Sequence, residues 1–170
     1  GEIQYISFQG NNLEQNTQQH GIVIEGSGGK WEIANNLISQ LGGYGIWLSR
    51  SDWTAYLKIA DNYFTGNHRS DIYGMGISSN QINSVLIDNN RFDESKEHAI
   101  HIMGVNINIT NNTFEGLGDV AILLSAAGIE ADITNGPMRI AQNYFEMNRG
   151  SDIAIEFGYD GSFAHAHRNL

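Results

Sequence analysis

The chain has 170 residues, which suffices for one domain with a sizeable core but not for two. Charged residues make up 16%, Gly occurs 20 times and Pro once, while Ile and Asn occur 22 and 19 times. Ile favours half-buried pleated surfaces and Asn favours tight turns, so this composition indicates a β protein and argues against a helical bundle.

The net charge of -10 argues against several classes of partner. A nucleic-acid-binding protein needs a basic surface that releases counterions, and an anionic membrane surface also attracts basic segments. No apolar run approaches the roughly 20 residues that span a bilayer. Cys is absent, which excludes disulfides and thiolate metal sites. We therefore expect neither a nucleic-acid partner nor a membrane partner.

One short motif, apolar-x-apolar-x-x-Asn-x-apolar, recurs along the whole chain. Its six copies occupy residues 6–13, 31–38, 57–64, 85–92, 107–114 and 138–145, and a degraded seventh copy occupies 164–170. The aligned residues are Asn11, Asn36, Asn62, Asn90, Asn112, Asn143 and Asn169. Successive Asn residues are 22 to 31 positions apart, so the chain consists of repeats.

A second motif, small-Ile-x-apolar, places its Ile 10 to 15 residues after each Asn of the first six copies. Its copies occupy residues 21–24, 45–48, 76–79, 99–102, 121–124 and 154–157. The alternation of apolar residues in both motifs is typical of short strands. Short strands repeated at this period, with no helical pattern, predict the coils of a β-solenoid.

Stacked coils place equivalent residues about 4.8 Å apart, so each motif position predicts a column of similar side chains. We expect three internal columns: Ile22, Ile46, Ile77, Ile100, Ile122 and Ile155; Phe8, Ile33, Ile59, Ile87, Ile109 and Ile140; and Leu13, Ile38, Phe64, Phe92, Phe114 and Phe145. The repeated Asn occupies the bend between two strands. There Asn tolerates the left-handed backbone conformation, and its amide can bond to the next coil as a ladder.

The two motifs together resemble the right-handed parallel β-helix repeat. Pectate-lyase-like enzymes, polysaccharide lyases, polygalacturonases, carbohydrate epimerases and bacteriophage tailspikes share that repeat. The resemblance covers residues 3–170 and implies one all-β domain, residues 1–170, with about six to seven coils. Since the chain starts almost at a motif and stops within the seventh copy, we expect a fragment of a longer solenoid. The resemblance also implies a homotrimer and an extracellular or virion-associated protein.

The catalytic signatures of polygalacturonases and of calcium-dependent pectate lyases are absent, so no active-site residue can be carried over from the family. We expect no cofactor, and nothing in the sequence supports a Ca²⁺ site. Candidate site residues are therefore sought in the loops that vary between coils, because function on a rigid scaffold usually lies there.

One row of loop residues lies three positions before the Ile of each second motif: Gln19, Gly43, Gly74, Glu97, Asp119 and Asp152. The last three are carboxylates from neighbouring coils, adjacent members about 5 Å apart and the outer two about 10 Å apart. A separation of about 5–5.5 Å suits retaining glycoside hydrolysis, and one of about 6.5–9.5 Å suits inversion. Crowding would raise one pKa, and Asp119, in the middle, is the candidate for sharing a proton. His101 on the adjacent strand completes the catalytic candidates. The alternative is that solvated acids form a row by chance.

Further residues near this row are candidates for substrate binding. They are Trp47, His98, Arg149 and Glu156, with Arg69 and Asp71 in the long loop 65–75 of the third coil. An exposed Trp can form a sugar platform, and an Arg can bind a substrate oxygen or carboxylate. If the carboxylate row does not form, this third-coil loop, which also holds His68, is the next candidate site. By contrast, we expect a solvated edge at Glu14, Asp93, Glu115 and Glu146.

Three functions remain open from the sequence. The favoured one is a polysaccharide-processing enzyme, a hydrolase or lyase acting on a bacterial-surface or plant-type glycan, as in a phage tailspike segment. The alternatives are a glycan-binding segment without catalysis and a structural shaft of a tail fibre. An enzyme predicts close carboxylates with shifted pKa values, whereas a binding segment predicts exposed aromatic residues. The low content of Lys and Arg favours a neutral or weakly acidic glycan.

Overall fold

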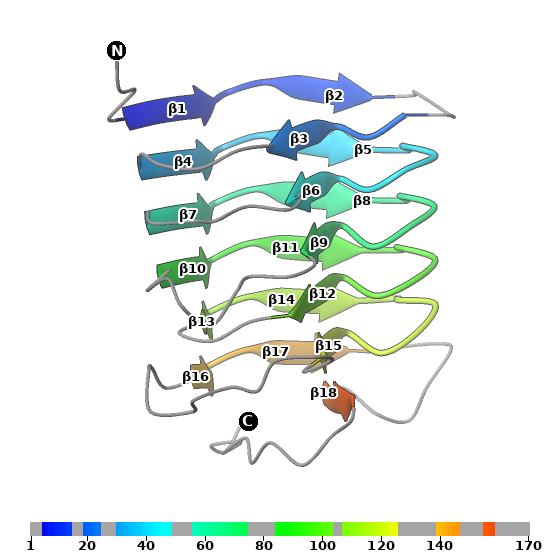
Figure 1. Cartoon of the computed structure of the whole chain (residues 1–170). Helices are drawn as coiled ribbons and strands as arrows, with labels where there is room; N and C mark the ends of the chain where they lie inside the picture. The colour runs from blue at the N-terminus through cyan, green and yellow to red at the C-terminus, as the bar shows by residue number, and fades with distance from the viewer. Residues whose placement is uncertain are drawn as a thin grey trace.

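The protein is a stack of short parallel strands, as the computed structural model shows (Figure 1). The structure describes residues 5–14, 19–24, 30–48, 56–74, 84–103, 107–125, 139–146 and 155–158. Within them, 18 strands form three sheets of six strands each, and every sheet takes every third strand of the chain. The described residues therefore make six coils, each of which contributes one strand to each sheet.

The three sheets are named here in the order in which the chain visits them. Sheet A contains β1 (Tyr5–Gln9), β4 (Lys30–Ala34), β7 (Tyr56–Ala60), β10 (Ser84–Asp88), β13 (Ile107–Thr110) and β16 (Arg139–Ala141). Sheet B contains β2 (Asn12–Glu14), β5 (Leu37–Ser39), β8 (Tyr63–Thr65), β11 (Arg91–Asp93), β14 (Thr113–Glu115) and β17 (Tyr144–Glu146). Sheet C contains β3 (Ile22–Ile24), β6 (Ile46–Leu48), β9 (Ile72–Gly74), β12 (Ile100–Met103), β15 (Ile122–Ser125) and β18 (Ile155–Gly158).

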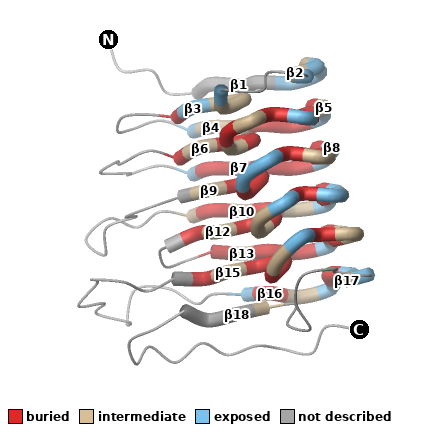
Figure 2. Tube along the Cα trace, turned by 90° about the vertical axis from the view of Figure 1, so that its right-hand side faces the viewer, coloured by how far each residue is buried: buried red, intermediate tan, exposed pale blue. Residues whose placement is uncertain are grey.

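The predicted β-solenoid is confirmed, and its core consists of columns of like side chains. Buried residues recur at the same places in successive coils (Figure 2). The rings of Phe64, Phe92, Phe114 and Phe145 stack nearly parallel, with centroids 4.9–5.0 Å apart. Ile33, Ile59, Ile87, Ile109 and Ile140 form the predicted column in sheet A. Because each ring or branched side chain packs on its equivalent in the next coil, the same packing arrangement fills the core in every coil.

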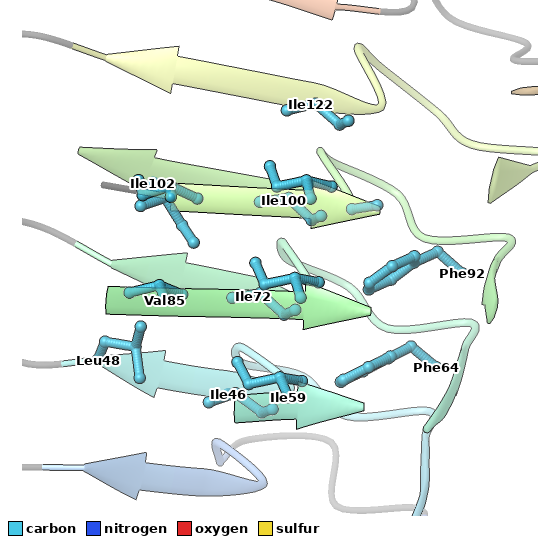
Figure 3. Close-up of a cluster of buried hydrophobic side chains, with 14 of the residues drawn as sticks. Ile46, Leu48, Ile59, Phe64, Ile72, Val85, Phe92, Ile100, Ile102 and Ile122 are labelled. Carbon is cyan, nitrogen blue, oxygen red and sulfur yellow. The ribbon is translucent and has the colours of Figure 1, made fainter. Parts of the chain in front are cut away.

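The third column contains Ile72 and not the predicted Ile77. Ile72 pairs in register with Ile46 and with Ile100, and Figure 3 shows it between them. Residues 76–79, where the second motif was placed in this coil, lie outside the described residues. Ile72 follows Asn62 by 10 residues, the same separation as in the next two coils. The alignment therefore placed this strand too far along the chain, because the true strand follows Asp71 and lacks the small residue that precedes Ile elsewhere.

The Asn ladder is confirmed from Asn11 to Asn143. In each coil the backbone N–H and the side-chain Nδ2 of the ladder Asn both donate to Oδ1 of the Asn in the next coil, at 2.8–3.2 Å. The remaining Nδ2 hydrogen bonds to a carbonyl of the preceding coil, as from Asn90 to Ile59 O at 3.0 Å. Asn90 and Asn112 are at most 2% exposed, so these bonds satisfy amides that water cannot reach.

The left-handed residue at this bend is the one before the ladder Asn, and its assignment to the ladder Asn itself was wrong. Positive φ angles of 52–67° occur at Gly10, Asn35, Asp61, Asn89, Asn111 and Gln142. This residue turns the chain between sheets A and B, and the next residue can then direct its amide inwards. A second left-handed residue follows sheet B in four coils, at Gln40, Gly66, Glu94 and Gly116.

One group of buried polar side chains interrupts the apolar core. Asp71 is completely buried, and its two carboxylate oxygens accept hydrogen bonds from Asn67 Nδ2, at 2.6 Å, and from Ser95 Oγ. Burial raises the pKa of Asp71 to about 7, the two hydrogen bonds oppose this rise, and the charge of Asp93 adds to it. The third coil therefore contains a buried carboxyl group that gains or loses its proton near neutral pH.

The Asn ladder supports a test of stability. Replacing Asn90 with Leu removes its amide and leaves polar groups of the two neighbouring coils unpaired in the core. We expect the free energy of unfolding to fall by on the order of 1–3 kcal/mol. Urea denaturation measures it, and Asn89→Gly is a matched control in the same turn, because Asn89 is exposed and Gly adopts its left-handed conformation without strain, as Gly10 does in the first coil. A stability equal to that of the wild type would show that the ladder is not needed.

Asp71 supports a second test, of pH dependence. An unfolded Asp has a pKa of about 3.9, so the folded state binds this proton more tightly. Its contribution to stability is therefore present below pH 4 and is lost as the pH rises through about 7. Asp71→Asn is neutral at every pH and can keep both contacts: its Oδ1 accepts from Asn67 Nδ2, and its Nδ2 donates to Ser95 Oγ in place of accepting from it. We expect the wild type to lose stability relative to this variant between pH 4.5 and 8 in urea denaturation, and parallel pH profiles would contradict the assignment.

Candidate functional site

The outer face of sheet C carries a row of ring side chains. The central residue of each strand segment points away from the core, because its two neighbours pack inwards. Backbone pairing places these residues in register: Val23, Trp47, Tyr73, His101 and Leu123. All of them have side chains that reach the surface at least in part. Three adjacent coils thus present aromatic or imidazole rings on one face.

A second row lies in the turn that leads into the same strands, and its rings pack against the first. Tyr44 stacks on Tyr73 with centroids 4.2 Å apart and on His20 at 5.1 Å. Trp47 lies tilted against His20, with centroids 4.7 Å apart. Tyr73 contacts His101 in the next coil with centroids 5.0 Å apart, and His101 contacts His98 of the same coil at 5.4 Å. We call His20, Tyr44, Trp47, Tyr73, His98 and His101 the aromatic ridge.

The two histidines at one end of the ridge have distinct surroundings. Burial, and then the neighbouring His98, lower the pKa of His101, so its ring is neutral near pH 7. The Nδ1 atom of His98 lies 3.2 Å from the carbonyl oxygen of Val120. A carbonyl only accepts hydrogen bonds, so Nδ1 carries the hydrogen in this contact. In the neutral ring, Nε2 of His98 therefore keeps its lone pair and can accept a proton.

Arg69 extends over the ridge from the turn before β9. Its guanidinium lies 5.5 Å from the centroid of the Tyr44 ring and donates from one NH group to the Tyr44 hydroxyl at 3.3 Å. This hydrogen bond is the largest effect that raises the pKa of Arg69, and the charge of Glu97 also contributes. The side chain is exposed, so a cation lies at the surface between Tyr44 and Glu97.

Two of the three predicted catalytic carboxylates are described, and they lie beside the ridge. Glu97 and Asp119 each stand three residues before an Ile of the same column and are partly exposed. Asp119 Oδ2 lies 3.9 Å from Nδ1 of His98, and Asp119 Oδ1 accepts from the Val120 N–H at 2.7 Å. The third member, Asp152, and the substrate-binding candidate Arg149 lie outside the described residues.

The register of β9 changes the composition of the predicted rows. With Ile72 in the column, Arg69 takes the place assigned to Gly74, and Tyr73 takes the outward place between Trp47 and His101. Arg69 thus lies in the same row as Glu97 and Asp119. Glu156 lies on β18, where its backbone pairs with Leu123. The ridge residues His20, Tyr44 and Tyr73 were missed, although the separation of 10 residues between Asn and Ile in the second, fourth and fifth coils could have located Tyr73.

Asp71 does not belong to a binding surface. It was a candidate for substrate contact because it lies in the long third-coil loop. Its side chain is 0% exposed and is enclosed by Asn67 and Ser95. The backbone explains this placement, because Asp71 occupies the inward position that Gly45 and Ala99 fill in the adjacent coils. Sequence position alone could not distinguish this inward Asp from the outward Arg69 two residues earlier.

The outer face of sheet B has a different character. Asp93, Glu115 and Glu146 pair in register. Arg91 donates to Glu115 at 2.8 Å and to Asp93 at 3.3 Å, and it covers the exposed ring of Tyr63. These carboxylates are partly or fully exposed, which fits the solvated edge expected from the sequence. Their ion pairs with a surface Arg are of the kind that contributes little to stability.

Two other functional features are absent from the described ranges, a metal-binding cluster and a membrane-spanning helix. No group of three or more His, Asp or Glu side chains there could hold a metal ion. No helix long and apolar enough to cross a membrane occurs among the same residues. The ridge and its charged neighbours are thus the described surface with the most varied chemistry: rings, imidazoles, a guanidinium and two carboxylates.

Comparisons with known proteins identify the fold family. No curated protein and no solved structure matches the chain. A family model described as a right-handed β-helix region matches residues 2–163. This match agrees with the three parallel sheets and supplies the hand of the coil, which the crossover rule for parallel strands also favours. The chain belongs to the right-handed β-helix family.

Proposed function

We propose that the chain binds a glycan along the aromatic ridge on the outer face of sheet C. The observation that carries this proposal is the unbroken ring contact from His20 through Tyr44 and Tyr73 to His101, with Arg69 beside it. The β-helix fold is consistent with a polysaccharide-related protein. The ridge follows the axis of the stack, so it suits an extended chain ligand better than a small compact one.

The packing within the ridge determines how a sugar would be recognised. The rings of Tyr44 and Tyr73 lie nearly parallel, 6° apart, so each covers a face of the other. Stacked rings expose their edges and polar groups, which here are phenol hydroxyls and imidazole nitrogens. These groups donate and accept hydrogen bonds, as do the hydroxyl groups of a sugar. Recognition would therefore use hydrogen bonds at ring edges, with Trp47 tilted at the margin.

Rigidity is the second argument for binding at this face. The ridge residues belong to adjacent strands or to the turns before them, and each touches at least one other ring. A ligand that binds to side chains already held in place avoids much of the entropy of ordering them. A run of half-buried rings on one face of a β-solenoid is therefore suited to repeated weak contacts with successive sugar units.

The binding proposal predicts a loss of affinity when the ridge is altered. The wild type, applied to an array of bacterial-surface polysaccharides and plant-type oligosaccharides, should retain at least one glycan. Tyr73→Ala and Arg69→Gln should each weaken binding of that glycan about tenfold or more, because each removes hydrogen-bonding groups from the centre of the ridge. Dissociation constants measured by calorimetry check this expectation.

The opposite sheet offers a matched control for that experiment. Tyr63 is an exposed Tyr on sheet B that also lies beneath an Arg side chain, so Tyr63→Ala removes the same kind of surface group. It should leave glycan affinity unchanged. Equal weakening by the variants of both faces, or unchanged binding by both ridge variants, would contradict binding at sheet C.

A specific contact favours glycan cleavage as a second candidate function. His98 is oriented through Nδ1 by the carbonyl of Val120, and Asp119 lies 3.9 Å from the same nitrogen. An imidazole held this way can act as a general base through Nε2, while Glu97 supplies a carboxyl group in the same turn as His98. These groups suit either glycoside hydrolysis or elimination, with Asp119 and Glu97 as the acidic members.

Cleavage predicts products that binding alone does not give. Incubation of the wild type with the retained polysaccharide should release oligosaccharides, whose masses distinguish addition of water from elimination. Asp119→Asn should reduce the rate by about 100-fold or more, because it removes a carboxylate from the reacting centre. Full cleavage by Asp119→Asn would exclude this residue, and release of no product by the wild type would leave the binding function alone.

A further inference from the structure

The interior of coils 3 and 4 departs from the pattern of its neighbours. At one inward column the residues are Leu41, Asn67, Ser95 and Leu117, and at another they are Gly45, Asp71, Ala99 and Ala121. Coils 2 and 5 thus fill both columns with apolar or small residues. In coils 3 and 4, three polar side chains replace them, and all three are at most 1% exposed. We call Asn67, Asp71 and Ser95 the polar brace.

The brace closes a turn upon itself. Asn67 Nδ2 donates to Asp71 Oδ1 at 2.6 Å, which joins the two ends of the turn 67–71. Asn67 is fixed further, because its Oδ1 accepts from the Leu41 N–H at 3.0 Å and its Nδ2 also donates to Ile38 O at 3.2 Å. Arg69 is the central residue of this turn. The brace therefore holds both ends of the segment that carries the cation of the ridge.

The brace also connects that turn to the next coil. Ser95 Oγ donates to the second carboxylate oxygen of Asp71. Ser95 begins the equivalent turn of coil 4, which carries Glu97 and His98 on its outer side. Backbone bonds run alongside, from the Lys96 N–H to Asn67 O at 3.0 Å and from the Asp71 N–H to His98 O at 3.2 Å. One buried carboxyl group thus ties together the two turns that supply the charged side chains beside the ridge.

Stability alone does not explain these three residues. A buried carboxyl group loses its hydration, and well-packed apolar side chains often replace buried polar groups with no loss of stability or with a gain. Two other coils of the chain fill these columns without polar side chains: coil 2 with Leu41 and Gly45, and coil 5 with Leu117 and Ala121. The polar version occurs beneath Arg69, Glu97 and His98, where precise placement of side chains would matter.

We propose that the polar brace is a positioning element, which fixes Arg69 against the Tyr44 ring and relative to Glu97 so that the ridge can bind its glycan. This inference rests on the proposed glycan binding for its biological meaning, although its structural part can be tested without any glycan. Asn67, Asp71 and Ser95 act through Arg69 and do not themselves contact the ligand.

The test compares two versions of the brace. The apolar variant Asn67→Leu/Asp71→Ala/Ser95→Leu copies the columns of coils 2 and 5. Asp71→Asn, by contrast, supplies a neutral side chain of the same shape that still contacts both partners, with the Ser95 bond reversed so that the Asn Nδ2 donates to Ser95 Oγ. The readouts are unfolding in urea, the heteronuclear NOE of the Arg69 Nε–Hε group, identified by its loss in Arg69→Gln, and the dissociation constant for the glycan retained on the array.

We expect the apolar variant to be at least as stable as the wild type, to have a mobile Arg69 side chain and to bind glycan at least tenfold more weakly. Asp71→Asn should keep the ordered Arg69 and the wild-type affinity at pH 7. An apolar variant with an ordered Arg69 and full affinity would overturn the proposal. If the apolar variant does not fold, Ser95→Ala, which removes a single hydrogen bond of the brace, takes its place. The proposal is then overturned unless Ser95→Ala folds and has a mobile Arg69 side chain.

The two proposals fail in different ways. If Arg69 becomes mobile in the apolar variant but the wild type retains no glycan, the brace positions Arg69 and glycan binding is refuted. If the wild type binds glycan and the apolar variant binds it equally well with an ordered Arg69, glycan binding stands and the brace proposal is refuted.

Discussion

In-register parallel pairing is the constraint on which the rest of this structure depends. Every position of a coil lies about one strand spacing from the same position in the next coil, so each side chain must tolerate its own equivalents as neighbours. Phe on Phe and Asn on Asn satisfy this rule in the interior. At the surface it is satisfied by opposite charges, as where Lys58 lies over Glu32 at 2.9 Å. The same rule brings Tyr44, Tyr73 and the ridge histidines into contact.

The sequence predicted those parts of the fold in which neighbouring coils use the same residue. The Asn ladder, the Phe stack and the Ile column of sheet A are of this kind, because identical side chains at a regular spacing reveal the register directly. The prediction failed where a coil departs from its neighbours. Asp71 stands in a column of Gly and Ala, and this exchange concealed Ile72 as the start of β9. The separation of 10 residues from Asn62, which the two following coils share, would have identified Ile72 correctly.

The candidate site could be predicted only in part, for a related reason. Glu97, His98, Asp119 and His101 were found because their coils have regular motifs. The wrong register in the third coil hid the outward position of Tyr73 and the place of Arg69 in the row of charged residues. Asp71 was expected at the surface, but its side chain is buried in the core. Ring stacking between Tyr44 and Tyr73 depends on side-chain directions, which no alternation pattern specifies.

The Asn ladder gives the stack a polarity. In the bonds between ladder Asn residues, Oδ1 always accepts from the preceding coil and Nδ2 always donates to the following one, and the backbone N–H groups that donate to Oδ1 fix this choice of orientation. The amide dipoles therefore add along the axis instead of cancelling. A coil added before the first one must supply donors for the Oδ1 atom at that end. A coil added after the last one must supply an acceptor for the N–H and Nδ2 groups at the other end. Two such stacks can continue one another head to tail, whereas joining like ends would bring acceptor to acceptor or donor to donor.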